Sequence, residues 1–130
     1  MSASCGLYPV RAGLVAVVVA RDGRASPPLR AGSTAMDHRN LLHRIDATGD
    51  IELVLPDWLA RTSPLGEVVA QSRMPVWIAP AGLVEATLII ARAHGGVRSA
   101  AAIARLLLPH GLRASLRPIP QVDPRQLNLV

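Results

Sequence analysis

Several residue types that particular functions need are scarce in this chain of 130 residues. It has one cysteine, Cys5, so no internal disulfide is possible, which is typical of proteins in a reducing compartment. It has no lysine and no phenylalanine, and its only aromatic residues are Tyr8, Trp58 and Trp77. The core must therefore be built mainly from aliphatic side chains.

Long hydrophobic runs are also missing. The longest, Leu14 to Ala20, is far shorter than the roughly 20 residues of a membrane-spanning helix and is closed by Arg21 and Asp22. The first residues show no basic region followed by an apolar stretch and a cleavage site, so no secretory signal is visible. We therefore expect a cytoplasmic protein with no membrane partner.

The positive charge comes from arginine alone. Fourteen arginines against nine acidic residues give a formal net charge of +5. Guanidinium groups match phosphate geometry well, which permits non-specific contact with DNA. Because the arginines are scattered and form no run, a G+C-rich coding bias that favours arginine over lysine is the better explanation of the composition.

The first third of the chain predicts a hairpin. Leu14 to Ala20 is rich in β-branched residues and leads into Asp22-Gly23, a strong signal for a two-residue hairpin turn. A second strand should return over about residues 24–30. Pro27 and Pro28 cannot donate hydrogen bonds to a neighbouring strand, so this strand should be irregular or lie at an edge.

The rest of the chain predicts alternating helices and strands. Thr34 and Asp37 form a capping box for a helix over about 36–47, and Asp57 is expected to cap a helix that continues to about Arg73. The other predicted elements are strands at 51–55 and 76–79 and helices at 83–93 and 99–108. Residues 1–117 would form one α/β domain with a mixed sheet, and residues 118–130 a proline-rich linker or the start of a helix. A flavodoxin-like doubly wound sheet is the alternative.

Three short motifs suggest a family. Gly6-Leu7-Tyr8 precedes the first hydrophobic strand, Asp57 follows the strand at 51–55, and Val97 to Ala101 opens the last predicted helix. In order and spacing they resemble the N-terminal RuvC-like, ribonuclease H-type domain of the DEDD insertion-sequence transposases. The resemblance implies a ribonuclease H-like fold and descent from a mobile genetic element.

The same resemblance implies that the active site is degenerate. Tyr8 stands where the family has its first metal-binding aspartate, Pro56 or Asp57 where it has a glutamate, and Val97 and Ala100 where it has its last two aspartates. Catalysis in this fold class needs two divalent ions held by several carboxylates. Tyrosine, valine and alanine cannot supply the oxygen ligands that Mg²⁺ requires. We therefore expect no cofactor, and Mg²⁺ only if substitute acids restore the site.

Other candidate residues are weaker. Asp57 is the one residual catalytic acid, although an aspartate before a helix usually caps it. Glu52 and Glu85 could replace the missing acids, but we expect both to be ordinary strand and helix residues. His38 and His43 are spaced five apart and should not share a helix face. Cys5 has no neighbour that would activate it as a nucleophile.

Three arginines are the candidate nucleic-acid contacts. Arg92, Arg98 and Arg105 recur at intervals of six and seven and could lie along one helical face. The sequence thus favours a non-catalytic, transposase-derived domain that binds DNA weakly or associates with protein, either as a homo-oligomer or with a larger transposase-type partner. Two alternatives stay open: a metal-dependent nuclease that uses Asp57 with substitute acids, and a structural module with a flavodoxin-like fold.

Overall fold

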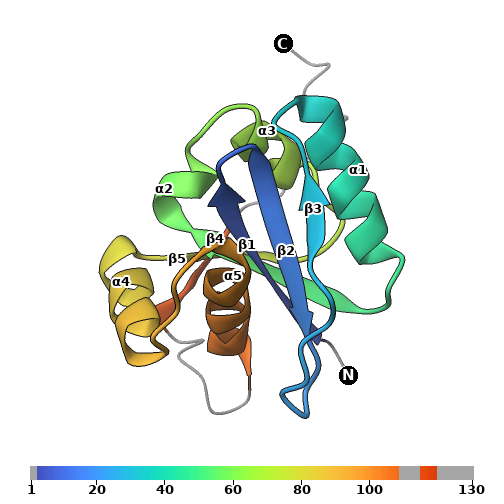
Figure 1. Ribbon diagram of the computed structural model, residues 1–130. Helices are drawn as coiled ribbons and strands as arrows, with labels where there is room; N and C mark the ends of the chain where they lie inside the picture. The colour runs from blue at the N-terminus through green and yellow to red at the C-terminus, as the bar shows by residue number, and fades with distance from the viewer. Residues whose placement is uncertain (1–2, 109–114, 120–130) are drawn as a thin grey trace.

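The computed structural model describes residues 3–108 and 115–119, which form one sheet flanked by helices (Figure 1). The strands are β1 (Ala3–Val10), β2 (Gly13–Val19), β3 (Leu29–Ala31), β4 (Ile51–Pro56), β5 (Val76–Ala79) and β6 (Arg117–Pro118). The helices are α1 (Ala35–Asp46), α2 (Asp57–Ala60), α3 (Leu65–Ala70), α4 (Ala81–Ile90) and α5 (Gly96–Ala104), followed by a 3₁₀ turn, η1 (Arg105–Leu107).

The strand order confirms the expected ribonuclease H-like mixed sheet. It is β3-β2-β1-β4-β5-β6. The first three strands form an antiparallel ribbon, β1 is parallel to β4, and β4 is parallel to β5. The short β6 closes the other edge antiparallel to β5. The flavodoxin-like alternative is wrong, because a doubly wound sheet would have its first strands parallel.

The opening ribbon follows from its residues. β2 carries mostly β-branched side chains, which pack well on a pleated surface. After it, Gly23 has a φ of 90°, a conformation that glycine adopts without strain, and Val19 bridges to Ala25. β3 begins only after Pro27 and Pro28 and pairs with β2 alone, so the returning strand is short and lies at the edge as predicted.

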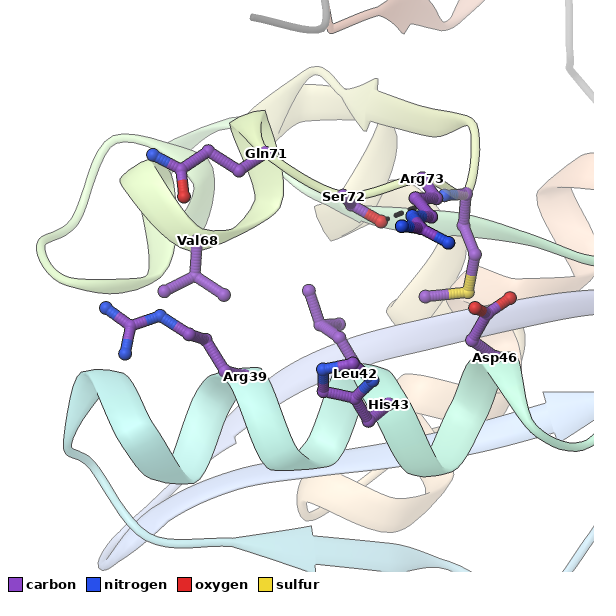
Figure 2. A pocket seen from close by; sticks show the side chains of 9 residues that line it. Arg39, Leu42, His43, Asp46, Val68, Gln71, Ser72 and Arg73 are labelled. Atoms are coloured by element: carbon purple, nitrogen blue, oxygen red, sulfur yellow. Dashed lines mark hydrogen bonds between the residues drawn. The ribbon is translucent and has the colours of Figure 1, made fainter. Parts of the chain in front are cut away.

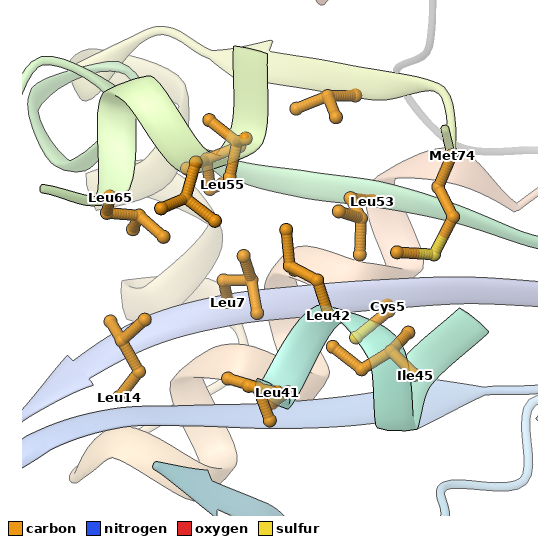
Figure 3. Close-up of a cluster of buried hydrophobic side chains, with 14 of the residues drawn as sticks. Cys5, Leu7, Leu14, Leu41, Leu42, Ile45, Leu53, Leu55, Leu65 and Met74 are labelled. Atoms are coloured by element: carbon orange, nitrogen blue, oxygen red, sulfur yellow. The ribbon is translucent and has the colours of Figure 1, made fainter. Parts of the chain in front are cut away.

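The two faces of the sheet bury different clusters. Alternate residues of β1 and β4, such as Leu7 and Leu53, pack with Leu41 and Ile45 of α1 and with α3, and Figure 3 shows these side chains pointing toward one another. On the other face, Val54 packs with residues of α4 and α5, and three valines of β2 pack against α5: Val15, Val17 and Val19. This alternation is the two-residue period of a strand with both faces covered.

Gly6 allows α5 to pack directly on β1. A Cβ atom at position 6 would overlap the backbone carbonyl oxygen of Ala100 and lie 2.9 Å from the backbone nitrogen of Ala104. Ala100 and Ala104 are themselves fully buried, so the helix presents only small residues to the strand. The glycine of the Gly6-Leu7-Tyr8 motif is therefore explained by helix–sheet packing.

The helix at α1 matches its prediction closely. The Oγ1 of Thr34 accepts a hydrogen bond from the backbone N–H of Asp37 at 3.1 Å. The Oδ2 of Asp37 accepts one in return from the backbone N–H of Thr34 at 3.2 Å. Both bonds of the expected capping box are therefore present, and they fix where the helix begins.

The single helix expected from Asp57 to Arg73 is wrong. The chain forms α2 and α3 instead, and they are separated by residues 61–64. Pro64 explains the break, because within a helix a proline removes a backbone hydrogen bond and clashes with the carbonyl four residues earlier. The helix after Pro80 runs over 81–90 and the last over 96–104, so the other predicted helices are present with shifted ends.

The predicted boundary between the domain and its tail, at residue 118, falls within a strand of the sheet. Pro118 is the second residue of β6 and pairs with Trp77 of β5. Residues 120–130 lie outside the described part of the chain, so the prediction of a linker or helix there stays open. Among the described helices, none has the length and apolar character needed to cross a membrane.

Candidate functional site

The candidate site lies where β1 and β4 end. These strands are parallel, with Gly6 beside Val54, so Tyr8 comes next to the end of β4, where Asp57 starts α2. The first turn of α5 reaches the same place, since a Cβ atom on Gly96 would touch the side chain of Val10. Arg117 of β6 also lies here, because it pairs with Asp57. We call this region, formed by residues 8–11, 57–61, 96–99 and 117, the carboxyl edge.

Tyr8 occupies the centre of the carboxyl edge and makes apolar contacts there. Its ring lies edge-on to that of Trp58, with centroids 5.8 Å apart and planes at 85°. On its other side it packs in the cluster that contains Val15, Val97 and Ala101. Trp58 is partly open to solvent, with 37% of its surface exposed. The position at which the resemblance requires an aspartate is thus part of an aromatic and aliphatic cluster.

Asp57 is engaged in ion pairs. Its Oδ1 lies 3.5 Å from Nη2 of Arg117 on β6, and its Oδ2 lies 3.5 Å from Nη2 of Arg61, one helical turn later. The expected role as helix cap is wrong: Asp57 is the first residue of α2, and the cap position is Pro56, which makes no side-chain hydrogen bond. Because both carboxylate oxygens face guanidinium groups, Asp57 links the two ends of α2 to each other and α2 to β6.

The residues of the carboxyl edge do not fit the Mg²⁺ ions that the transposase resemblance implies. One carboxylate is present, and each of its oxygens faces an arginine, while Val97 and Ala100 offer no ligand atoms. Over residues 3–108 and 115–119, no group of three or more histidines, cysteines or acids is placed to hold a metal ion. A two-metal reaction has no ligand set here.

The proposed substitute acids lie elsewhere. Glu52 accepts a hydrogen bond from Nε1 of Trp77 at 3.3 Å and stands beside Ser4, near the opposite end of β4. Five residues of strand separate it from Asp57, a distance of about 16 Å. Glu52 therefore cannot share a metal ion with Asp57. Glu85 is exposed on α4.

The three predicted arginines do not share a helix face. Arg92 lies just beyond the end of α4, where its φ of 51° takes the chain out of the helix. It is therefore not part of α5, which begins at Gly96. Arg98 is exposed in the first turn of α5, at the carboxyl edge. Arg105 is exposed at the opposite end of α5, where its Nη2 donates to the carbonyl of Gly23 at 3.3 Å.

Three arginines that the sequence reasoning missed join Arg98 at the carboxyl edge. Arg11 is exposed in the turn directly after β1, and Arg61 and Arg117 pair with Asp57. The spacing of four between Asp57 and Arg61 on a helix was a readable signal for one of them. The sequence held no such signal for Arg117, because its partner, Asp57, lies sixty residues earlier in the chain.

Cysteine and histidine are not brought into this site. Cys5 is fully buried on the opposite face of the sheet, and burial raises the pKa of its thiol to about 12, so it stays protonated at neutral pH. His38 is buried, His43 and His94 are exposed, and no metal cluster includes them within the described ranges. His110 lies outside the described residues.

Known proteins give no further guide to the function. No protein-family model matches this chain, and no curated protein matches it significantly. We therefore infer the function from the fold and from the residues gathered at the carboxyl edge.

Proposed function

We propose that this chain is a non-catalytic, transposase-derived ribonuclease H-like domain whose carboxyl edge binds the phosphate backbone of DNA without sequence specificity. The observation that supports it most is the charge at this edge. Arg61 and Arg117 pair with its one acid, Asp57, and Arg11 and Arg98 are exposed on the adjoining segments, where a nuclease of this fold would gather carboxylates. The same edge that would hold cations in an active enzyme is suited to hold anions here.

The exposed arginines supply contacts of the right kind. Arg11 and Arg98 are exposed on neighbouring segments, and the side chains of Arg61 and Arg117 keep 72% and 69% of their surface exposed despite their pairing with Asp57. Exposed guanidinium groups can reach phosphates without burying their charge. If three of these arginines contact phosphates, the logarithm of the binding constant should fall with the logarithm of the salt concentration with a slope of about −2.7. Binding would then weaken roughly 40-fold between about 50 and 200 mM salt.

The test is a fluorescence anisotropy titration of labelled duplex and branched DNA at low and moderate salt. The double variant Arg11→Ala/Arg98→Ala removes two expected phosphate contacts and leaves both ion pairs of Asp57 intact. It should weaken binding and make the salt slope shallower by about 1.8. Arg24→Ala is the matched control, because Arg24 is an exposed arginine in the hairpin turn at the other end of β2.

Two results would defeat this proposal. One is the absence of binding at about 50 mM salt, where electrostatic attraction is strongest. The other is a loss of binding free energy in the Arg24→Ala control that is half of the loss in the double variant or more. Since Arg24→Ala removes one charge and the double variant two, that result would mean that only net charge matters and that the carboxyl edge has no special role.

Protein association is the second candidate, and one observation favours it. Ile89 and Ile90, at the end of α4, keep 69% and 83% of their surface exposed. Within that helix, Val84 alone is buried. Adjacent exposed isoleucines are unusual on a monomer surface. Sedimentation velocity over a range of concentrations, with Ile89→Glu as the disrupting variant, separates this function from DNA binding.

A further inference from the structure

A groove runs between α1 and the segment that joins α3 to β5, on the sheet face opposite α5 (Figure 2). Its volume is about 240 Å³. One wall is the face of α1 that carries Arg39 and His43, and the other wall includes Gln71 and Arg73. The proposed DNA-binding edge and this groove share no residue.

The floor of the groove is apolar and well packed. Leu42, Val68 and Met74 line it, and they keep only 7%, 6% and 5% of their surface exposed because they also belong to the main core. The loop above Met74 is held in place by Ser72, whose Oγ accepts a hydrogen bond from the backbone N–H of Met74 at 3.1 Å. The groove is therefore a preformed surface, which lowers the entropic cost of binding.

The rim of the groove carries positive charge that the protein does not neutralise. Arg39 and His43 are four residues apart on α1 and so project from the same side of the helix. Arg73 stands on the other wall, as Figure 2 shows. Neither Arg39 nor Arg73 forms an ion pair or hydrogen bond with any of the described residues. Their guanidinium groups can therefore accept an anionic ligand without breaking an internal contact.

The one acid on the rim, Asp46, makes the two ends of the groove differ in charge. Asp46 lies seven residues after Arg39 on α1, about 10 Å further along the helix axis. Figure 2 shows its carboxylate on the side of the groove where Arg73 lies, at the far end from Arg39. An anion is therefore favoured at the Arg39 end, and the body of the ligand would lie along the apolar floor towards Asp46.

We propose that this groove binds a small amphiphilic anion, in which a phosphate or carboxylate group is attached to a flat apolar body. The anionic group contacts Arg39 and His43, and the apolar body covers Leu42 and Val68. The volume of about 240 Å³ is smaller than that of most small-molecule sites, which begin at about 300 Å³, so the apolar body should have no more than one or two fused rings.

The test uses 1-naphthyl phosphate as the probe, 1-naphthoate as the carboxylate arm and 1-naphthol as the neutral analogue. Two-dimensional ¹H–¹⁵N spectra of the labelled protein report which amides shift. The phosphate or the carboxylate should shift amides in 39–46 and 71–74 and bind at least tenfold more tightly than the naphthol. Whichever acid binds more tightly identifies the anionic group.

Two variants complete the test. Arg39→Gln should remove most of the preference for the anion over the naphthol, whereas Arg44→Gln should keep it. Arg44 is the matched control because it is on the same helix but donates to the carbonyl of Arg30, away from the groove. Shifts that map elsewhere, equal affinity for charged and neutral probes, or an unchanged preference in Arg39→Gln would each overturn the proposal.

Discussion

Replacing Asp57 with asparagine tests whether this acid is structural or a remnant of catalysis. Asp57 joins α2 to β6 through Arg61 and Arg117, with both N···O distances at 3.5 Å. The two arginine side chains are mostly exposed, so each pair should contribute about 0.2–1 kcal/mol, as exposed ion pairs do. The Asp57 side chain itself is 25% exposed, which favours the upper part of that range. We expect Asp57→Asn to lower the free energy of unfolding by about 1 kcal/mol in total.

The assay is urea denaturation of the wild type, Asp57→Asn, Arg61→Gln, Arg117→Gln and the corresponding double variants. Each double-mutant cycle should give a coupling energy of about 0.2–1 kcal/mol that shrinks as salt is added. A loss of about 1 kcal/mol should appear as a fall of roughly 4 °C in the thermal midpoint of a domain of this size.

Magnesium supplies the contrasting arm of the same experiment. A ligand that binds only the folded state raises its stability in proportion to the logarithm of its concentration. Because the carboxylate of Asp57 faces two guanidinium groups, about 10 mM Mg²⁺ should leave the melting temperature unchanged apart from the general effect of salt. A rise with Mg²⁺ that disappears in Asp57→Asn, or an Asp57→Asn variant more stable than the wild type, would refute the structural role.

Three further predictions concern packing, capping and pH. Gly6→Ala should destabilise the domain by about 1–3 kcal/mol in urea denaturation, because the added Cβ would push α5 away from β1 at the Ala100 carbonyl; an unchanged midpoint would contradict the packing. Thr34→Ala should cost about 1 kcal/mol by removing the cap of α1, whereas Thr34→Ser should cost much less, as measured by the same denaturation curves. Burial lowers the pKa of His38 from 6.5, so below about pH 6.5 the unfolded chain takes up a proton before the folded one does. Stability should therefore fall as the pH drops from about 7.5 to 5, and His38→Leu should show a smaller fall.

Local chemistry made much of the fold predictable. Thr34 and Asp37 marked the start of α1 because their side chains bond to backbone groups within one turn. The β-branched run before Asp22-Gly23 marked β2 and its turn for similar reasons. The break between α2 and α3 does not follow from hydrophobic periodicity, because Leu65, Val68 and Val69 have helical spacing; it follows from Pro64, which interrupts a helix whatever the apolar pattern.

The candidate site was less predictable because it depends on contacts between distant segments. That Tyr8 lies beside the end of β4 follows from the parallel pairing of β1 and β4, and motif order was enough to indicate it. The role of Asp57 depends on Arg117, which only the complete sheet brings near. Of the three arginines read from sequence spacing, Arg98 alone lies at the carboxyl edge, because spacing carries meaning only within one helix.

The most direct test of the central claim combines binding and cleavage on one substrate. Labelled nicked and branched DNA is incubated with the protein and Mg²⁺ or Mn²⁺, and anisotropy and strand cleavage are measured on the same samples. The account predicts salt-sensitive binding that weakens in Arg11→Ala/Arg98→Ala, with the DNA strands left intact. Cleavage that Asp57→Asn abolishes would contradict it.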